Sequence, residues 1–218
     1  MPEKSCYKIK DGMTMEQAVL SEPLAIGIYS VKQSCCTKKM NIGILGVGTI
    51  GLSVLLAVKS QGVNSVYVTD KISERVAVAA RISNGWVGNT DKEDIVEKIK
   101  CSEPDGLDVI FECCGKQEAL DQAIELLKPG GKLVIVGIPG TERVSFNINN
   151  LRRKEISILN IRRQVNCTQA ALDAIDSGDM NVDFMATHQF RPAQAKEAFE
   201  LAADYRDGVI KAMIAFGK

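Results

Sequence analysis

A glycine-rich turn after an apolar run constrains the fold of this chain more than any other feature. The run IGIL is followed directly by GVGTIG and then by a segment of helical period. In such a strand–turn–helix unit, Gly46 permits a tight exit from the strand, Gly48 lets the backbone approach a pyrophosphate, and Gly51 lets the helix lie close to the sheet. The helix would begin at Ile50, directly after Thr49, with its N-terminus facing the negative charge of the ligand. The turn therefore predicts a dinucleotide-binding βα unit.

The segments after this unit repeat its alternation of short β-rich runs and helical runs. We expect strands at 41–46, 65–70, 86–89, 107–115, 132–140 and 156–163, and helices at 50–62, 73–83, 91–100 and 117–128. Ser73 is expected as the N-cap of the second helix, and Asp91 near the positive end of the third. Right-handed crossovers then give an α/β, doubly wound Rossmann fold with a six-stranded parallel sheet.

The remaining segments do not continue this series. Residues 146–154 read as a polar connection, and residues 168–178 and 192–203 as helices. Residues 208–216 read as one last strand with no helix after it. Residues 1–23 precede the alternation without forming a unit of their own.

Composition excludes several classes of partner. The 27 Lys and Arg residues balance 27 Asp and Glu residues, so no net field draws nucleic acid or an acidic membrane surface. The longest apolar stretches are far shorter than the roughly 20 residues that cross a bilayer. The N-terminus carries charges and no apolar core of a signal peptide, which favours a cytoplasmic protein.

Seven cysteines occur without any C-x-x-C spacing. This usage indicates reduced thiols and argues against a disulfide framework or a structural zinc knuckle. His188 is the only histidine, so the chain cannot supply a set of histidines for a catalytic metal.

Residues at the ends of later strands extend the predicted cofactor site. Asp70 ends the second strand about 20 residues after the turn, where a carboxylate accepts bonds from the adenosine ribose and repels a 2′-phosphate. This favours NAD over NADP, although the cations Lys71 and Arg75 keep NADP open. Strands four and five end at Cys113, Cys114 and residues 136–138, beside the crevice for the nicotinamide half. The candidate cofactor residues are Gly46, Gly48, Thr49, Ile50, Gly51, Asp70, Lys71, Arg75, Cys113, Val136, Gly137 and Ile138.

Ordered motifs along nearly the whole chain resemble one family. They are SEPLAIGIYSV, ILGVGTIGL, VTDKISERV, DVIFECCG, LKPGGKLVIVGIPG, INNLRRKEISILNIRRQ and DGVIKAMI. With these motifs the chain resembles the medium-chain, zinc-dependent alcohol and polyol dehydrogenases, in the sorbitol, iditol and threonine dehydrogenase branch. The resemblance implies hydride transfer between a secondary alcohol and NAD.

The same resemblance implies a division into domains. Residues 24–165 would be the NAD-binding domain, residues 1–23 a remnant of a GroES-like catalytic domain, and residues 166–218 the returning segment of that domain. The family's zinc ligands would lie upstream of residue 1. We therefore expect the cofactor half of a dehydrogenase, without turnover by the 218-residue chain alone.

The resemblance also implies roles for single residues. Glu22 matches a glutamate at or near the catalytic zinc of sorbitol-type members, and we expect it to be metal-free here because zinc wants about four ligands. Arg163 matches an arginine near nicotinamide and substrate. Its neighbours Arg162 and Gln164 stand where sorbitol dehydrogenases carry aromatic residues, which leaves the substrate open. His188 is expected to be structural.

Two alternative functions and one partner complete the expectations. Class I methyltransferases, which bind S-adenosylmethionine, share a glycine-rich first turn, an acid after strand two and an LKPGG-like approach to strand five. Gly51 and the EPLA and KAMI segments favour the dehydrogenase. A non-catalytic nucleotide-binding module is the other alternative. The sixth strand would form an apolar sheet edge, which predicts a homodimer along that edge.

Overall fold

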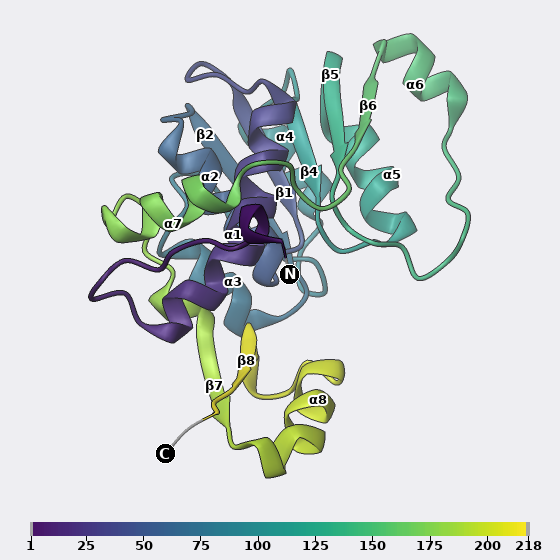
Figure 1. The fold of residues 1–218 in the computed structure, drawn as a ribbon. Helices are drawn as coiled ribbons and strands as arrows, with labels where there is room; N and C mark the ends of the chain where they lie inside the picture. The colour runs from purple at the N-terminus through teal and green to yellow at the C-terminus, as the bar shows by residue number, and fades with distance from the viewer. Residues whose placement is uncertain (1, 217–218) are drawn as a thin grey trace.

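A six-stranded parallel sheet forms the centre of the computed structural model, which describes residues 2–216 (Figure 1). The strand order is β3-β2-β1-β4-β5-β6, and each neighbouring pair is parallel. The order reverses between β1 and β4, and ligands of doubly wound sheets bind outside the carboxyl ends of the strands at such a point. The expected fold is confirmed. The strands are β1 (Asn41–Leu45), β2 (Ser65–Asp70), β3 (Val87–Asn89), β4 (Leu107–Glu112), β5 (Leu127–Ile135) and β6 (Ser157–Asn160).

Helices cover both faces of this sheet. One apolar core lies between the sheet and α1, α2, α3 and α7, and a second lies between the sheet and α4 and α5. Burial on both faces explains why β4 is apolar almost throughout. The helices are α1 (Met15–Ser34), α2 (Thr49–Ser60), α3 (Ser73–Ala80), α4 (Ile95–Ser102), α5 (Gln117–Leu126), α6 (Ile148–Lys154), α7 (Thr168–Asp176) and α8 (Ala195–Ala203).

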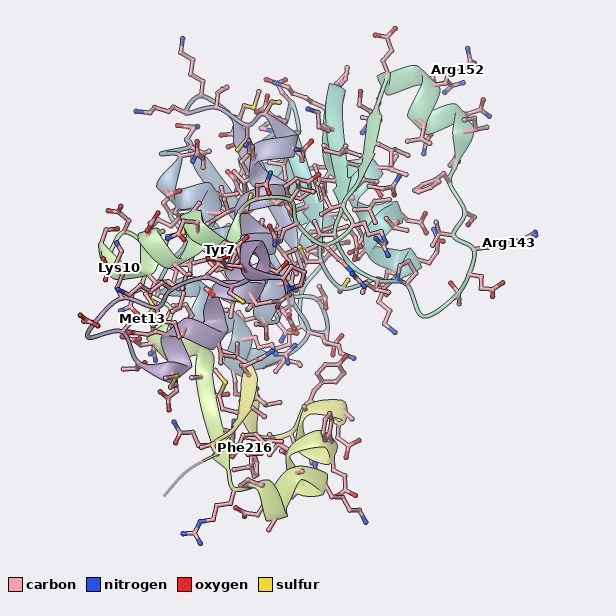
Figure 2. The ribbon with its side chains drawn as sticks, viewed as in Figure 1. Tyr7, Lys10, Met13, Arg143, Arg152 and Phe216 are labelled. Atoms are coloured by element: carbon pink, nitrogen blue, oxygen red, sulfur yellow. The ribbon has the colours of Figure 1, made fainter. Side chains whose placement is uncertain are left out.

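A smaller unit extends from the main body. The strands β7 (Ala186–Phe190) and β8 (Lys211–Ile214) pair in parallel, and α8 connects them (Figure 1). At the other end of the chain, Lys10 bonds to Asp176 at 2.8 Å and so ties the N-terminal segment to α7 (Figure 2). Arg143 and Arg152 stand on a separate arm that α6 and its preceding loop form (Figure 2).

Helix α1 was not expected from the sequence. Its start is fixed by a capping box, in which Thr14 accepts from the Gln17 amide and the Gln17 side chain accepts from the Thr14 amide. A Cβ on Gly27 would stand 2.5 Å from the Ser53 carbonyl group, so α1 packs directly on α2. The helix runs through the expected boundary between residues 23 and 24, and that boundary stays a prediction.

One expected helix cap and one expected helix start were wrong. Helix α3 begins at Ser73 as expected, but its N-cap is Ile72 rather than Ser73, and no side chain caps this helix. The helix expected from residue 91 begins at Ile95 instead, and its N-cap is Asp94, whose carboxylate accepts from the amides of residues 96 and 97. Asp91 lies earlier, in a turn where its amide donates to the Asn89 side chain.

Residues 146–154 also differ from the expected polar connection. They include helix α6, which Asn147 caps by accepting from the amides of Asn149 and Asn150. Among the helices of residues 2–216, none combines the length and apolar character that crossing a bilayer requires.

Candidate functional site

The glycine turn between β1 and α2 is packed so tightly that side chains would not fit at two of its positions. Gly46 has φ +92°, and its amide donates to the Thr69 carbonyl at 2.8 Å. A Cβ on Gly51 would stand 1.9 Å from the Gly46 carbonyl oxygen. Gly48 is the N-cap of α2 and brings no capping side chain. The first amides of a helix lack partners within it, so this end of α2 can bind an anion.

Asp70 stands at the edge of this turn. Its carboxylate is only 8% exposed and accepts from two backbone amides, those of Val47 at 2.7 Å and Ile72 at 2.8 Å. Each oxygen of a carboxylate can accept more than one bond. The carboxylate is therefore fixed in orientation and keeps capacity for the hydroxyls of a ligand.

Residues near the C-terminus complete the turn. Arg75 donates from Nε and Nη2 to the Val209 carbonyl, at 3.2 and 2.6 Å, and its Nη1 lies 3.2 Å from where a Cβ on Gly48 would stand. The Thr49 hydroxyl donates to the Ile210 carbonyl at 2.6 Å. This closure was not expected from the sequence, because no local pattern around residues 209 and 210 points to the turn.

These elements enclose a cleft of about 510 Å³ at the carboxyl ends of the strands. Most of the predicted cofactor residues line it, namely Gly46, Gly48, Thr49, Ile50, Asp70, Lys71, Arg75 and Cys113. Thr90, Asp91, Ala202, Tyr205 and Ile210 also line it and were not expected there. The other predicted residues do not line this cleft: Gly51 is buried below the turn, and Ile138 is 90% exposed. Val136 and Gly137 belong to the loop after β5.

The loops after β4 and β5 are joined through Glu112. One carboxylate oxygen, Oε1, accepts from the amides of Cys114 at 2.7 Å and Gly115 at 2.6 Å. The other oxygen, Oε2, is buried without a hydrogen-bond partner. A Cβ on Gly137 would stand 2.6 Å from this Oε2, so the β5 loop closes directly on the carboxylate. An acid at the end of a largely apolar strand was the available sequence signal for this contact.

The two cysteines after Glu112 are not reactive nucleophiles. Burial, followed by the charge of Glu112, raises the pKa of Cys113 well above its ordinary value and that of Cys114 to about 12. Because the thiolate is the reactive form, both stay neutral thiols near pH 7.

The residues matched to zinc and substrate lie apart from the cleft. Glu22 is exposed on α1, and Arg163 is exposed in the segment after β6, with φ +56°. Within residues 2–216, no group of three or more His, Cys, Asp or Glu side chains is arranged to hold a metal ion. The described residues therefore do not fit a zinc site. His188 bonds to Thr187 at 2.9 Å and Asp207 at 3.2 Å, contacts that fit the structural role expected for it.

A larger hollow of about 770 Å³ opens at the opposite ends of β4 and β5. Its two lysines are already engaged by α5. Lys154 donates to the carbonyls of Ile124, Glu125 and Leu127, and Lys100 pairs with the Glu125 carboxylate at 2.6 Å. Burial lowers the pKa of Lys154. The cleft at the glycine turn, which is lined by a helix N-terminus, by Asp70 and by Arg75, is the better candidate site.

Comparisons with known proteins identify relatives of this architecture. The sequence model of the family described as "Zinc-binding dehydrogenase" matches residues 49–177. Sorbitol dehydrogenase of Bacillus subtilis is 29% identical over 98% of the chain, and that of Ovis aries is 32% identical over 89%. The chain spans 61% and 56% of the lengths of these relatives.

Solved structures agree with the sequence matches. An Escherichia coli oxidoreductase/dehydrogenase of unknown specificity superposes with a TM-score of 0.92 at 31% identity, over 99% of this chain and 62% of its own. A Sinorhizobium meliloti zinc-binding dehydrogenase, bound to NADP, superposes with a TM-score of 0.90 at 25% identity, over 98% of this chain and 64% of its own.

Proposed function

Because the chain belongs to the zinc-binding dehydrogenase family, we propose that it is the NAD(H)-binding part of an alcohol or polyol dehydrogenase. The reaction would move a hydride between a secondary alcohol and the nicotinamide ring, and sorbitol-like polyols are the favoured substrate class because sorbitol dehydrogenases are among the relatives. The single observation that supports cofactor binding is the convergence of the glycine turn, Asp70 and Arg75 on one cleft.

Each part of the cleft has a chemical role in this proposal. The first amides of α2, near Gly48, would bind the pyrophosphate, and the Arg75 guanidinium beside Gly48 would add positive charge there. The Asp70 carboxylate, held by two amides, would accept the ribose hydroxyls and repel a 2′-phosphate. The repulsion is the reason to propose NAD(H) over NADP(H), although a solved relative holds NADP.

The nicotinamide half would lie against the loops after β4 and β5. Glu112 fixes the backbone of the first loop and lies against Gly137 of the second. Val136 and Ile138 belong to the same wall in this proposal, and Arg163 would approach the nicotinamide from the segment after β6. The bound nicotinamide supplies the hydride acceptor, and these residues orient it and exclude water.

Residues 24–165 would form the NAD-binding domain, with residues 1–23 and 166–218 belonging to a catalytic domain. Glu22 would then take part in a metal site only together with ligands from outside the described residues. The 218-residue chain by itself is expected to bind cofactor without oxidising an alcohol. Seven free cysteines support a reducing compartment such as the cytoplasm. The exposed strand β6 supports a homodimer along the sheet edge.

Calorimetric titration of the chain with NADH and, separately, with S-adenosylmethionine tests the proposal. We expect heat with NADH only, because the closely packed third glycine, Gly51, and the EPLA and KAMI segments favour the dehydrogenase. Asp70→Ala should weaken NADH binding about tenfold or more, since it removes a charge-assisted acceptor. Glu142→Ala is the matched control, because Glu142 is an exposed acid on the loop after β5. Heat with S-adenosylmethionine alone would favour the methyltransferase, and heat with neither would refute the proposal.

A further inference from the structure

Tyr205 lies at the mouth of the cleft, where sequence reasoning expected no residue of the returning segment. It follows α8 and lines the cleft together with Asp70, Lys71 and Arg75. Its ring is 53% exposed, so it is not part of a core. Its backbone has φ +53°, an uncommon conformation for a residue with a side chain. A large aromatic ring held at this position calls for a role at the site.

Two cations face the ring of Tyr205. The Arg75 guanidinium carbon lies 5.1 Å from the ring centroid, and the Lys71 ammonium lies 5.7 Å from it. Both distances are within the roughly 6 Å over which an aromatic face attracts a cation. Lys71 follows Asp70 directly in the sequence, and Arg75 lies on the next helix, α3. They are therefore the cations that would otherwise oppose the Asp70 charge at the ribose.

The loop that carries Tyr205 is anchored on three sides. Gly208 packs against α3 so closely that a Cβ would stand 2.8 Å from Cβ of Glu74. Asp207 bonds to His188 of β7 at 3.2 Å. The Val209 carbonyl accepts from Arg75 at 2.6 Å. These contacts hold the ring in place, and Figure 1 shows the loop reaching from the extension of α8 and β8 to the main body near α3.

We propose that Tyr205 is a specificity-determining residue, which draws Lys71 away from the ribose 2′ position so that the Asp70 charge there is unopposed and NAD(H) is preferred to NADP(H). Arg75 is already committed to the Val209 carbonyl and to the Gly48 side of the turn. Lys71 is exposed and has a long, flexible side chain, and its ammonium group faces the Tyr205 ring. Removing the ring would release an ammonium that can pair with a 2′-phosphate.

The inference rests on the proposed binding of a dinucleotide in this cleft, and the test separates the two. Dissociation constants for NADH and NADPH are measured by calorimetry for wild type, Tyr205→Leu and Tyr205→Phe. Leucine removes the ring but keeps a Cβ and apolar bulk, whereas phenylalanine keeps the ring face. We expect Tyr205→Leu to raise NADPH affinity relative to NADH about threefold to tenfold, the equivalent of one cation–π contact. Tyr205→Phe should leave the ratio unchanged.

A double variant identifies the cation responsible. In Lys71→Ala/Tyr205→Leu the gain for NADPH should disappear, because no ammonium is released. If Tyr205→Leu weakens NADH and NADPH equally, the ring merely packs on the adenosine and the inference is wrong, while the proposed function stands. An unchanged ratio of NADPH affinity to NADH affinity in Tyr205→Leu would likewise show that the inference is wrong, while the proposed function stands. If wild type binds neither dinucleotide, the proposed function fails and this inference fails with it.

Discussion

At the scale of single residues, Gly51 is the position where one added methyl group would do most damage to the cleft. A Cβ there would stand 1.9 Å from the Gly46 carbonyl oxygen, which is backbone and cannot rotate away. Gly51→Ala must therefore push α2 away from the turn. We expect a loss of about 1–3 kcal/mol in the free energy of unfolding and weaker NADH binding, measured by urea denaturation and calorimetry.

The control for this substitution is Gly140→Ala. A Cβ on Gly140 would meet nothing within 4 Å, so stability and NADH binding should both stay at wild-type values. Equal losses in the two variants would mean that the close approach at Gly51 is not the cause.

Cys114 gives a prediction about alkaline pH. Its pKa is raised to about 12 by burial and by Glu112, whereas the unfolded thiol ionises near 9.0. The folded state therefore keeps a proton that the unfolded state loses, and this contribution to stability is complete below pH 9 and declines as pH rises toward 12. Cys114→Ala should make the free energy of unfolding fall less steeply between pH 8 and about 10.5.

Cys6→Ala is the comparison, because Cys6 does not line the cleft, whereas Cys114 does. Its unfolding free energy should follow the wild-type slope with pH. Parallel slopes for wild type and Cys114→Ala would contradict the assignment of this titration to Cys114.

At the scale of secondary-structure elements, the cap of α4 can be tested by a pair of aspartates. Asp94 accepts from two first-turn amides, whereas Asp91 lies in the preceding turn. Asp94→Ala should lower the free energy of unfolding by about 0.5–2 kcal/mol, the usual range for a lost N-cap. Asp91→Ala should change it by less than about 0.5 kcal/mol, as a surface substitution does. Thermal unfolding of the two variants in parallel decides between them, and a larger loss in Asp91→Ala would reverse the assignment.

The same elements show which parts of the fold the sequence could predict. The central strands β1, β2 and β4 were recognised because burial on both faces makes them largely apolar, and helices such as α5 because one face alone is buried. Helix α1 was missed because apolar and small residues occur on all its sides and Pro23 lies within it. Strand β7 was missed because it is short and its partner β8 is distant in sequence.

The residues of the candidate site also include some that the sequence could predict and some that it could not. The turn at Gly46 and the acid at Asp70 belong to one local unit, and local spacing was sufficient to find them. Tyr205 and Val209 reach the site only through the tertiary fold, since Val209 lies 134 residues after Arg75. No periodic pattern carries such information. Gly51 and Ile138 do not line the cleft in this structure, and their part in cofactor binding stays a prediction.

At the scale of the whole molecule, the free edge of β6 leads to a prediction about assembly. This strand is last in the sheet order and is largely exposed, with Ile158 at its surface. If two copies pair along this edge, Ile158→Lys brings like charges together across the dimer axis and should halve the mass measured by light scattering. Phe199→Lys, on exposed α8, should leave the mass unchanged. A monomeric wild-type chain at micromolar concentration would contradict the homodimer.

The bonds from Thr49 and Arg75 to the carbonyls of residues 210 and 209 also matter while the chain is being made. Ile210 lies 161 positions after Thr49, so the glycine turn leaves the ribosome long before the residue to which Thr49 bonds. A nascent chain can form the early strands of the sheet, yet the cleft lacks these contacts until residues 209 and 210 have emerged. If the cleft binds a dinucleotide as proposed, cofactor can stabilise the chain only from that point on, and shorter translation products gain no such protection from proteolysis.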